Sequence, residues 1–342
     1  MYVISTGMIC PVGFDAASAC AAMRAGITMC EELSHSDKTG QPIIGASVPG
    51  LDRKVGREVQ LTELLCSAVI ECLDQGLEGP TGTIPILVGL SEPGRPGGNA
   101  DLADRVIGQL EEVLKRRFHP HLSQVLTSGH TAGIEALAIA RNLFRDSKIS
   151  SCLVCGVDSY INASSLSWLD HHWRLKTPEN SDGLVPGEAA AAVLLQYQSP
   201  SHRSPALKVR GIGFGRETAD VLSEEPLMAE GLTEATLGAL TEAGIAMHDI
   251  AFRLSDITGE SYGFKEQALV AGRLLRVHRD EGWPIWHGAE NVGDIGAAVG
   301  IGQLVVAFSA YQNAYAPGDL AICFTSAVPG HRAVAVLERT WD

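Results

Sequence analysis

The chain has 342 residues, of which 45% are hydrophobic and 19% charged, a composition that excludes intrinsic disorder and predicts one large or two ordinary globular domains. Its formal net charge of −14 argues against a protein that binds nucleic acid or an anionic membrane. The eight cysteines are scattered through apolar segments of a long chain. This predicts free thiols in a reducing, cytoplasmic compartment rather than a disulfide scaffold.

In chain order, short apolar runs alternate with amphipathic stretches, which is typical of an α/β fold with helices covering its sheets. Strands are expected at 2–7, 84–90, 151–157, 188–196, 206–213, 251–257, 319–325 and 332–338. Helices are expected at 14–25, 58–75, 99–116, 131–146, 231–245, 262–277 and 294–313. The segment 295–311 is apolar but contains glycines and Gln303, so we expect a buried helix and no membrane span.

Two stretches of the chain have the same order of elements, which indicates an internal duplication. Gly129-His130 opens a small-residue helix that leads to a strand ending at Cys155, and Gly293-Asp294 opens a second helix that leads to a strand ending at Cys323. We therefore expect two similar halves, 1–200 and 201–342, on either side of the turn-rich segment 199–205. The first copy carries extra residues, 160–186, which we expect to form a surface or dimer-facing loop.

In such a duplicated molecule the two helix starts would meet near a pseudo-twofold axis. The first N–H groups of a helix are unpaired and carry partial positive charge, so this meeting point could hold an oxyanion or a thioester oxygen. The pair Cys152 and Cys155 lies in an expected strand, where an odd separation sends two side chains to opposite faces. Neither this pair nor the adjacent His171 and His172 predicts a metal site, and no cofactor is expected.

Four segments resemble the thiolase superfamily, specifically its β-ketoacyl synthase branch. They are Thr6-Gly-Met-Ile-Cys-Pro-Val-Gly13, Thr127-Ser-Gly-His-Thr-Ala-Gly-Ile-Glu-Ala-Leu137, Asp182-Gly-Leu-Val-Pro-Gly-Glu-Ala-Ala190 and Pro329-Gly-His-Arg332. The resemblance implies a thiolase-like α/β fold with five layers, αβαβα, built from two duplicated halves. It also implies a homodimer, because relatives pair through a central strand.

In that family a cysteine at the start of the first helix accepts the acyl group, and two histidines, or a histidine and an asparagine, assist decarboxylation and condensation. The resemblance places these three positions at His130, Thr258 and Asp294, so all three residues differ from the family pattern. An imidazole cannot form the stable thioester intermediate that a thiolate forms. A carboxylate at position 294 would repel the substrate carboxylate and the enolate that develops from it.

Two functions remain open from the sequence. The first is a β-ketoacyl synthase-like protein with a degenerate active site, which acts as a binding or accessory subunit and in which His130 and Asp294 only satisfy each other's hydrogen bonds. Its partner would be an active synthase, an acyl carrier protein or other bacterial machinery. The second is an unconventional acyltransferase or hydrolase that uses His130 with Ser128 or Asp294 on acyl-CoA or acyl-carrier thioesters. Candidate substrate-binding residues are Ser128, Ser261 and Asn291.

Overall fold

The computed structural model describes residues 1–76, 83–146, 149–199, 206–278 and 282–340. Before residue 200 the strands are β1 (Tyr2–Ile9), β2 (Glu31–Ser36), β3 (Pro42–Gly45), β4 (Ile86–Gly89), β5 (Gln124–Leu126), β6 (Ser151–Ser159) and β7 (Glu188–Gln196). The helices of this part are α1 (Ala16–Arg24), α2 (Arg57–Gly76), η1 (Ala100–Leu102), α3 (Val106–Leu114), η2 (Gly129–Thr131), α4 (Ala132–Asp146) and α5 (Ala163–His171), where η marks a 3-10 helix.

After residue 205 the strands are β8 (Ala206–Arg216), β9 (Phe252–Ser255), β10 (Ile285–His287), β11 (Leu320–Ser326) and β12 (His331–Thr340). The helices are α6 (Glu230–Ala243), η3 (Met247–Asp249), α7 (Ser261–Leu274), α8 (Ala289–Val292), η4 (Gly296–Ala298) and α9 (Val299–Gln312). All the strands expected from the sequence are present. The helix expected at 99–116 is divided into η1 and α3, and the two glycine-led helices each begin with a 3-10 turn.

The duplication is visible in the order of the strands. Ten strands form one sheet in the order β10-β9-β11-β12-β8-β1-β7-β6-β4-β5. Counted outward from β8 and from β1, the two sets of strands have the same order, with two antiparallel pairings followed by two parallel ones. The expected boundary between the halves, at 200 and 201, lies outside the described residues.

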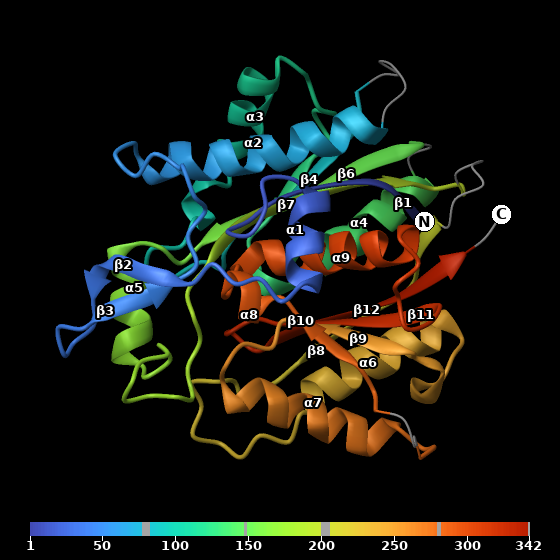
Figure 1. Ribbon diagram of the computed structural model, residues 1–342. Helices are drawn as coiled ribbons and strands as arrows, with labels where there is room; N and C mark the ends of the chain where they lie inside the picture. The colour runs from blue at the N-terminus through green and yellow to red at the C-terminus, as the bar shows by residue number, and fades with distance from the viewer. Residues whose placement is uncertain (77–82, 147–148, 200–205, 279–281, 341–342) are drawn as a thin grey trace.

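Five layers follow from this arrangement (Figure 1). Strands β1 and β8 pair only where Tyr2 and Val3 face Lys208 and Leu207, so the two sets diverge and leave room between them. Helices α1, α4 and α9 fill that room and form the central apolar core. Helices α2 and α3 cover the outer face of the first set, and α6 and α7 cover that of the second. The predicted α/β fold with layers αβαβα is confirmed.

The layers pack at close range because small residues stand where backbones cross. A Cβ at Gly7 in β1 would lie 2.0 Å from the carbonyl oxygen of Ala68 in α2. The helix α2 presents an apolar stripe to the sheet, with buried residues at Leu61, Leu64, Leu65, Ala68 and Cys72. In the described part of the chain, no helix is long and apolar enough to cross a membrane.

The expectation of a loop over residues 160–186 was wrong for 163–171, because these residues form the helix α5 (Ala163–His171). Asn162 begins the helix by accepting a hydrogen bond from the Ser165 backbone N–H at 3.0 Å. Leu166 and Leu169 are buried against Ile43 of the β2–β3 hairpin, forming a small separate core. The hairpin itself was not expected from the sequence. His171 and His172 lie at the end of α5 and are exposed.

Candidate functional site

The two glycine-led helix starts meet in the central layer, as the duplicated pattern predicts. His130 lies in η2, ahead of α4, and Asp294 lies just before η4 and α9. Both residues are 5% exposed, and His130 Nε2 lies 2.8 Å from Asp294 Oδ1. Two of the three positions that the family resemblance singled out are thus in direct contact.

The contact is an ion pair between an imidazolium and a carboxylate. Burial alone would lower the pKa of His130, but the charge and hydrogen bond of Asp294 outweigh it and raise the pKa to about 9. Burial alone would raise the pKa of Asp294, but His130 and the Gly296 backbone N–H hold it at about 2. Both groups are therefore charged at neutral pH, and His130 has no free proton-accepting nitrogen there.

Further carboxylates surround the imidazolium. Asp256, in the loop after β9, accepts a hydrogen bond from the Ser326 backbone N–H at 2.5 Å, and burial raises its pKa to about 7. Glu92 is 6% exposed, and its Oε2 has no hydrogen-bond partner in the described structure. Within the same described residues, His130 Nδ1 also lacks a partner. The centre is a buried cation held among acidic groups.

The backbone N–H groups of the second helix start are already occupied. Asp294 Oδ1 accepts from the Gly296 N–H at 2.9 Å, and Asp158 Oδ2 accepts from the Ala297 N–H at 3.0 Å. Asp158 also forms a buried ion pair with Arg95. Gly296 has φ of +50°, and a Cβ there would lie 2.1 Å from Asp158 Oδ2, so glycine permits this close approach. Two protein carboxylates thus take the place in which an oxyanion was expected.

The structure does not bring Ser128 to His130. The Ser128 hydroxyl donates to Glu135 Oε2 at 2.7 Å, and the Thr131 hydroxyl donates to Glu135 Oε1 at 2.7 Å. The hydroxyl is thus directed along α4 and away from the imidazole. A Ser128–His130–Asp294 triad, on which one form of the alternative enzyme hypothesis depends, is therefore not present in the structure.

The other candidate residues lie in three different surroundings. Thr258 is the remaining one of the three positions that the family resemblance singled out. Its hydroxyl lies 3.2 Å from Glu260 Oε2, and the residue lines both the cavity that contains His130 and a larger cavity on the other side of Asp294. Ser261 is exposed and donates to Asp182 Oδ2 at 2.7 Å. Asn291 is buried and lines the larger of the two cavities. Thr258 and Asn291 therefore adjoin the centre, whereas Ser261 does not.

The cavity that contains His130 is small and highly charged. Its volume is about 60 Å³, far below the roughly 300–1,000 Å³ of ordinary ligand pockets. Two ion pairs line it: Arg174 binds Glu260 through two bonds of 2.7 Å, and Arg332 Nε lies 2.7 Å from Glu266 Oε1. Sequence reasoning did not assign Arg174, Arg332 or Glu266 to the site, because their partners are 60 or more residues away along the chain.

No thiol takes the place of the missing cysteine. Cys152 and Cys155 are fully buried on opposite faces of β6, in different apolar cores, which confirms the geometry expected from their spacing. Burial raises the pKa of Cys152 to about 12 and that of Cys155 well above its usual range. Cys20 lines the larger cavity, where burial raises its pKa to about 11. The described residues also contain no cluster suited to a metal ion.

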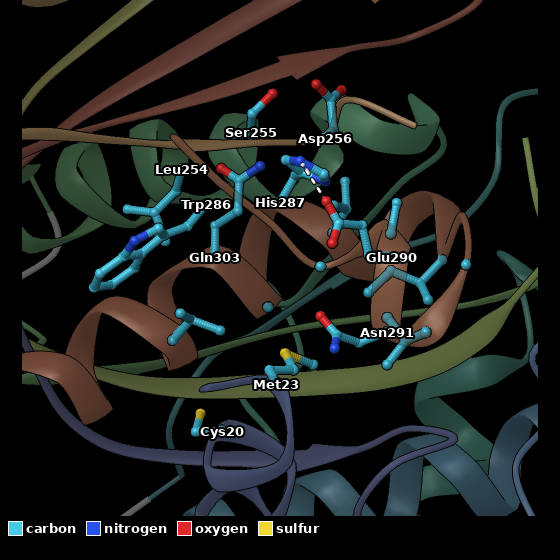
Figure 2. A pocket seen from close by; sticks show the side chains of 18 of the residues that line it. Cys20, Met23, Leu254, Ser255, Asp256, Trp286, His287, Glu290, Asn291 and Gln303 are labelled. Carbon is cyan, nitrogen blue, oxygen red and sulfur yellow. Dashed lines mark ion pairs between the residues drawn. The ribbon is translucent and has the colours of Figure 1, made fainter. Parts of the chain in front are cut away.

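The larger cavity lies on the other side of Asp294 and has a volume of about 430 Å³. It is bounded by α1, β9, β10, α8 and α9, and Figure 2 shows Trp286, Gln303 and Asn291 arranged around it. His287 of β10 also lines it, with Nε2 3.0 Å from Glu290 Oε1. This cavity is large enough for a small organic ligand.

Comparison with solved structures relates this architecture to proteins of known fold. The chain matches the ishigamide ketosynthase/chain length factor with a TM-score of 0.73 at 19% identity, over 99% of each chain. It matches a structure of the ketosynthase ApeO in complex with its chain length factor ApeC, from Xenorhabdus doucetiae, with a TM-score of 0.72 at 14% identity, over 99% of this chain and 98% of the other. A structure of AntDE:AntF, a type II PKS acyl-carrier protein in complex with its ketosynthase, gives a TM-score of 0.77 at 13% identity, over 99% of each chain.

No family model matches the sequence, and no curated protein matches it. At these identities the structural likeness shows the fold alone. The chain has the thiolase-like fold of ketosynthase and chain length factor domains.

Proposed function

We propose that this protein is a ketosynthase-like subunit that does not condense acyl chains and that supports an active ketosynthase as a binding or accessory partner. The buried ion pair between His130 and Asp294 carries the proposal. Where a condensing enzyme of this fold places a nucleophile facing a catalytic base, this chain has a cation and an anion that neutralise each other.

Three features of the centre argue against chemistry on thioesters. A protonated imidazole has no lone pair with which to attack a carbonyl or to activate water. The carboxylates of Asp294 and Asp256 would disfavour the enolate that decarboxylation produces. The cavity of about 60 Å³ beside His130 has no room for an acyl thioester.

The alternative enzyme, a hydrolase or acyltransferase that uses His130 with Ser128 or Asp294, receives less support. Ser128 donates to Glu135, so no hydroxyl nucleophile is activated by the imidazole. Asp294 would hold His130 in its protonated form throughout the neutral pH range. Such an enzyme would therefore need His130 to lose its proton well below its pKa of about 9.

The kind of partner is suggested by the fold. Structures of this fold include a ketosynthase in complex with its chain length factor and a ketosynthase in complex with an acyl-carrier protein. In this chain β5 is the end strand of the sheet beyond β4, and its outer edge has no neighbouring strand in the described residues. We assign this edge to pairing, either with a cysteine-containing ketosynthase or with a second copy of the chain. The eight free cysteines fit the cytoplasm, where such synthases work.

The test is incubation of the purified protein with acyl-CoA, malonyl-CoA and the corresponding acyl-carrier thioesters, followed by intact-mass measurement and assay of carbon dioxide and free thiol. We expect no adduct and no turnover, whereas a cysteine-containing ketosynthase treated in parallel gives both. His130→Ala and the exposed control His121→Ala should both leave the background rate unchanged. Turnover that is lost in His130→Ala but kept in His121→Ala would refute the proposal and support the alternative enzyme.

The partner is tested separately. The tagged chain is purified from its own host, and the mass of the complex is measured by native mass spectrometry. We expect a one-to-one complex with a ketosynthase that carries the active-site cysteine. A homodimer alone, with no ketosynthase retained, would exclude a stable accessory complex.

A further inference from the structure

The cavity of about 430 Å³ between α1, β9, β10 and α9 plays no part in the proposed function. Its wall combines polar groups with an apolar part that includes Met8, Met23, Leu254 and Trp286. The Trp286 indole is fixed in place by Phe252, at 4.6 Å between ring centres. Flexible thioethers beside a fixed aromatic ring suit an apolar body of variable shape.

Three hydrogen-bond acceptors on the lining residues have no donor in the part of the chain that the structure describes. The Asn291 side chain donates from Nδ2 to the Ile27 carbonyl at 2.7 Å, and that of Gln303 donates from Nε2 to the Phe324 carbonyl at 2.9 Å. These bonds fix both amides, and within the described residues neither Asn291 Oδ1 nor Gln303 Oε1 has a partner. Figure 2 shows the Asn291 oxygen pointing into the cavity. The third acceptor is Nδ1 of His287, which also has no partner when Nε2–H donates to Glu290.

An acceptor buried without a donor costs free energy, and Gln303 Oε1 is such an atom in the described structure. Asn291 and Gln303 are 7% and 6% exposed, and the Asn291 oxygen faces the cavity rather than a protein donor (Figure 2). A ligand that carries N–H or O–H donors would relieve this cost. A ligand that offers only acceptors, such as a carboxylate, would not.

The charges around the cavity are compatible with a cationic donor. The carboxylates of Asp256, Glu290 and Asp294 belong to residues that line it. The one arginine of the lining, Arg24, is exposed at the end of α1, with its guanidinium 4.3 Å from the centre of the Tyr315 ring. Asp294 is paired with His130 and Glu290 with His287, so the preference comes mainly from the acceptors: an ammonium would donate to them, whereas a carboxylate would place further oxygens beside them.

We propose that this cavity is a binding site for a small organic amine, with the apolar body against Trp286, Met8 and Met23 and the N–H donors toward Asn291 and Gln303. This site is independent of the proposed accessory function. The preference for N–H donors also distinguishes this cavity from an acyl pocket, since the thioester or carboxylate group of an acyl chain has no N–H to donate.

The experiment is calorimetric titration of the full chain at neutral pH with two pairs of ligands of matched shape: tryptamine against indole-3-propionate, and hexylamine against hexanoate. We expect each amine to bind at least about tenfold more tightly than its carboxylate, because a hydrogen bond to a charged group contributes about that factor. A carboxylate that binds as tightly as its amine would overturn the proposal, as would the absence of amine binding at millimolar concentration.

Two variants locate the binding. Gln303→Met removes one acceptor and keeps the size of the side chain, so amine affinity should fall about tenfold. Met23→Trp fills the cavity and should abolish binding of both amines. Gln312→Met, at the exposed end of the same helix α9, is the matched control and should bind as the wild type does. Thermal unfolding of each variant checks that it is folded, and amine binding unchanged in both folded cavity variants would refute the site.

Discussion

Replacing Asp294 by asparagine should remove the counter-charge that keeps His130 protonated. In the wild type the pKa of His130 is about 9, against an ordinary value of 6.5, a difference that corresponds to about 3 kcal/mol at about 1.4 kcal/mol for each pH unit. Because the folded pKa is raised, this stabilisation is complete below about pH 6.5 and is lost as the pH rises through about 9. In Asp294→Asn, burial is left without its counter-charge, and the pKa of His130 should fall below 6.5.

Two measurements follow from this difference. Proton NMR titration of the His130 ring should show a midpoint near pH 9 in the wild type and below 6.5 in the variant. Urea unfolding between pH 7 and 9.5 should show that the wild type loses about 2.5 kcal/mol that the variant does not lose, because part of the stabilisation is already lost between pH 6.5 and 7. The pKa of Asp256, which burial raises to about 7, lies at the lower edge of this window, so most of its effect on stability falls below the window and the remainder is common to both proteins. His121→Gln, in which an exposed imidazole is removed, is the control and should follow the wild type.

The reasoning would be refuted by a wild-type His130 that titrates near 6.5. It would also be refuted if His130 in Asp294→Asn kept a pKa above 8, because the charge of Asp256 or Glu92, rather than that of Asp294, would then keep the imidazole protonated. Parallel loss of stability in the wild type and the variant between pH 7 and 9.5 would lead to the same conclusion.

Two further predictions concern the surroundings of this centre. Arg332→Met leaves Glu266 as an unpaired buried carboxylate, since both side chains of the pair are only 1% exposed. Urea unfolding of this variant should therefore show a loss of about 3–5 kcal/mol in the free energy of unfolding. The double variant Arg332→Met/Glu266→Met should recover much of that loss, and a double variant as unstable as the single one would contradict the argument. Labelling of the native protein with a maleimide at neutral pH should modify one thiol per chain, that of Cys30, because the seven other cysteines are buried. After denaturation, all eight thiols should be modified. Rapid labelling of a second thiol in the native protein would mean that it has another accessible nucleophile.

Local patterns in the sequence predicted the elements of the fold well. The stripe of Ile134, Leu137 and Ala138 predicts a helix with one buried face, and in α4 the first two of these residues are fully buried. The same reasoning missed α5, because Ala163–His171 is rich in serine and has a weak apolar stripe. Its burial depends on the β2–β3 hairpin, which lies more than 100 residues earlier in the chain. The division of the chain at residues 200 and 201 stays a prediction.

For the candidate site, the resemblance of short motifs identified which positions to compare, and the duplicated glycine-led helices predicted that His130 and Asp294 would lie close together. Other contacts could not be read from the chain. Ser128 turns to Glu135 rather than to His130, a choice between two neighbours that depends on side-chain torsions. Asp158 and Arg95 occupy the second helix start, although their positions in the sequence give no sign of it.

The sequence by itself determined the alternation of strands and helices, the internal repeat and the identity of the residues at the three family positions, because these depend on periodicity and on order along the chain. Only the tertiary structure decided the ionic pairing of the centre, the small space beside His130 and the second cavity. Each of these depends on groups brought together from distant segments, 164 residues apart for His130 and Asp294. Burial and the charges of neighbouring groups, rather than residue type alone, then set the protonation state of the imidazole.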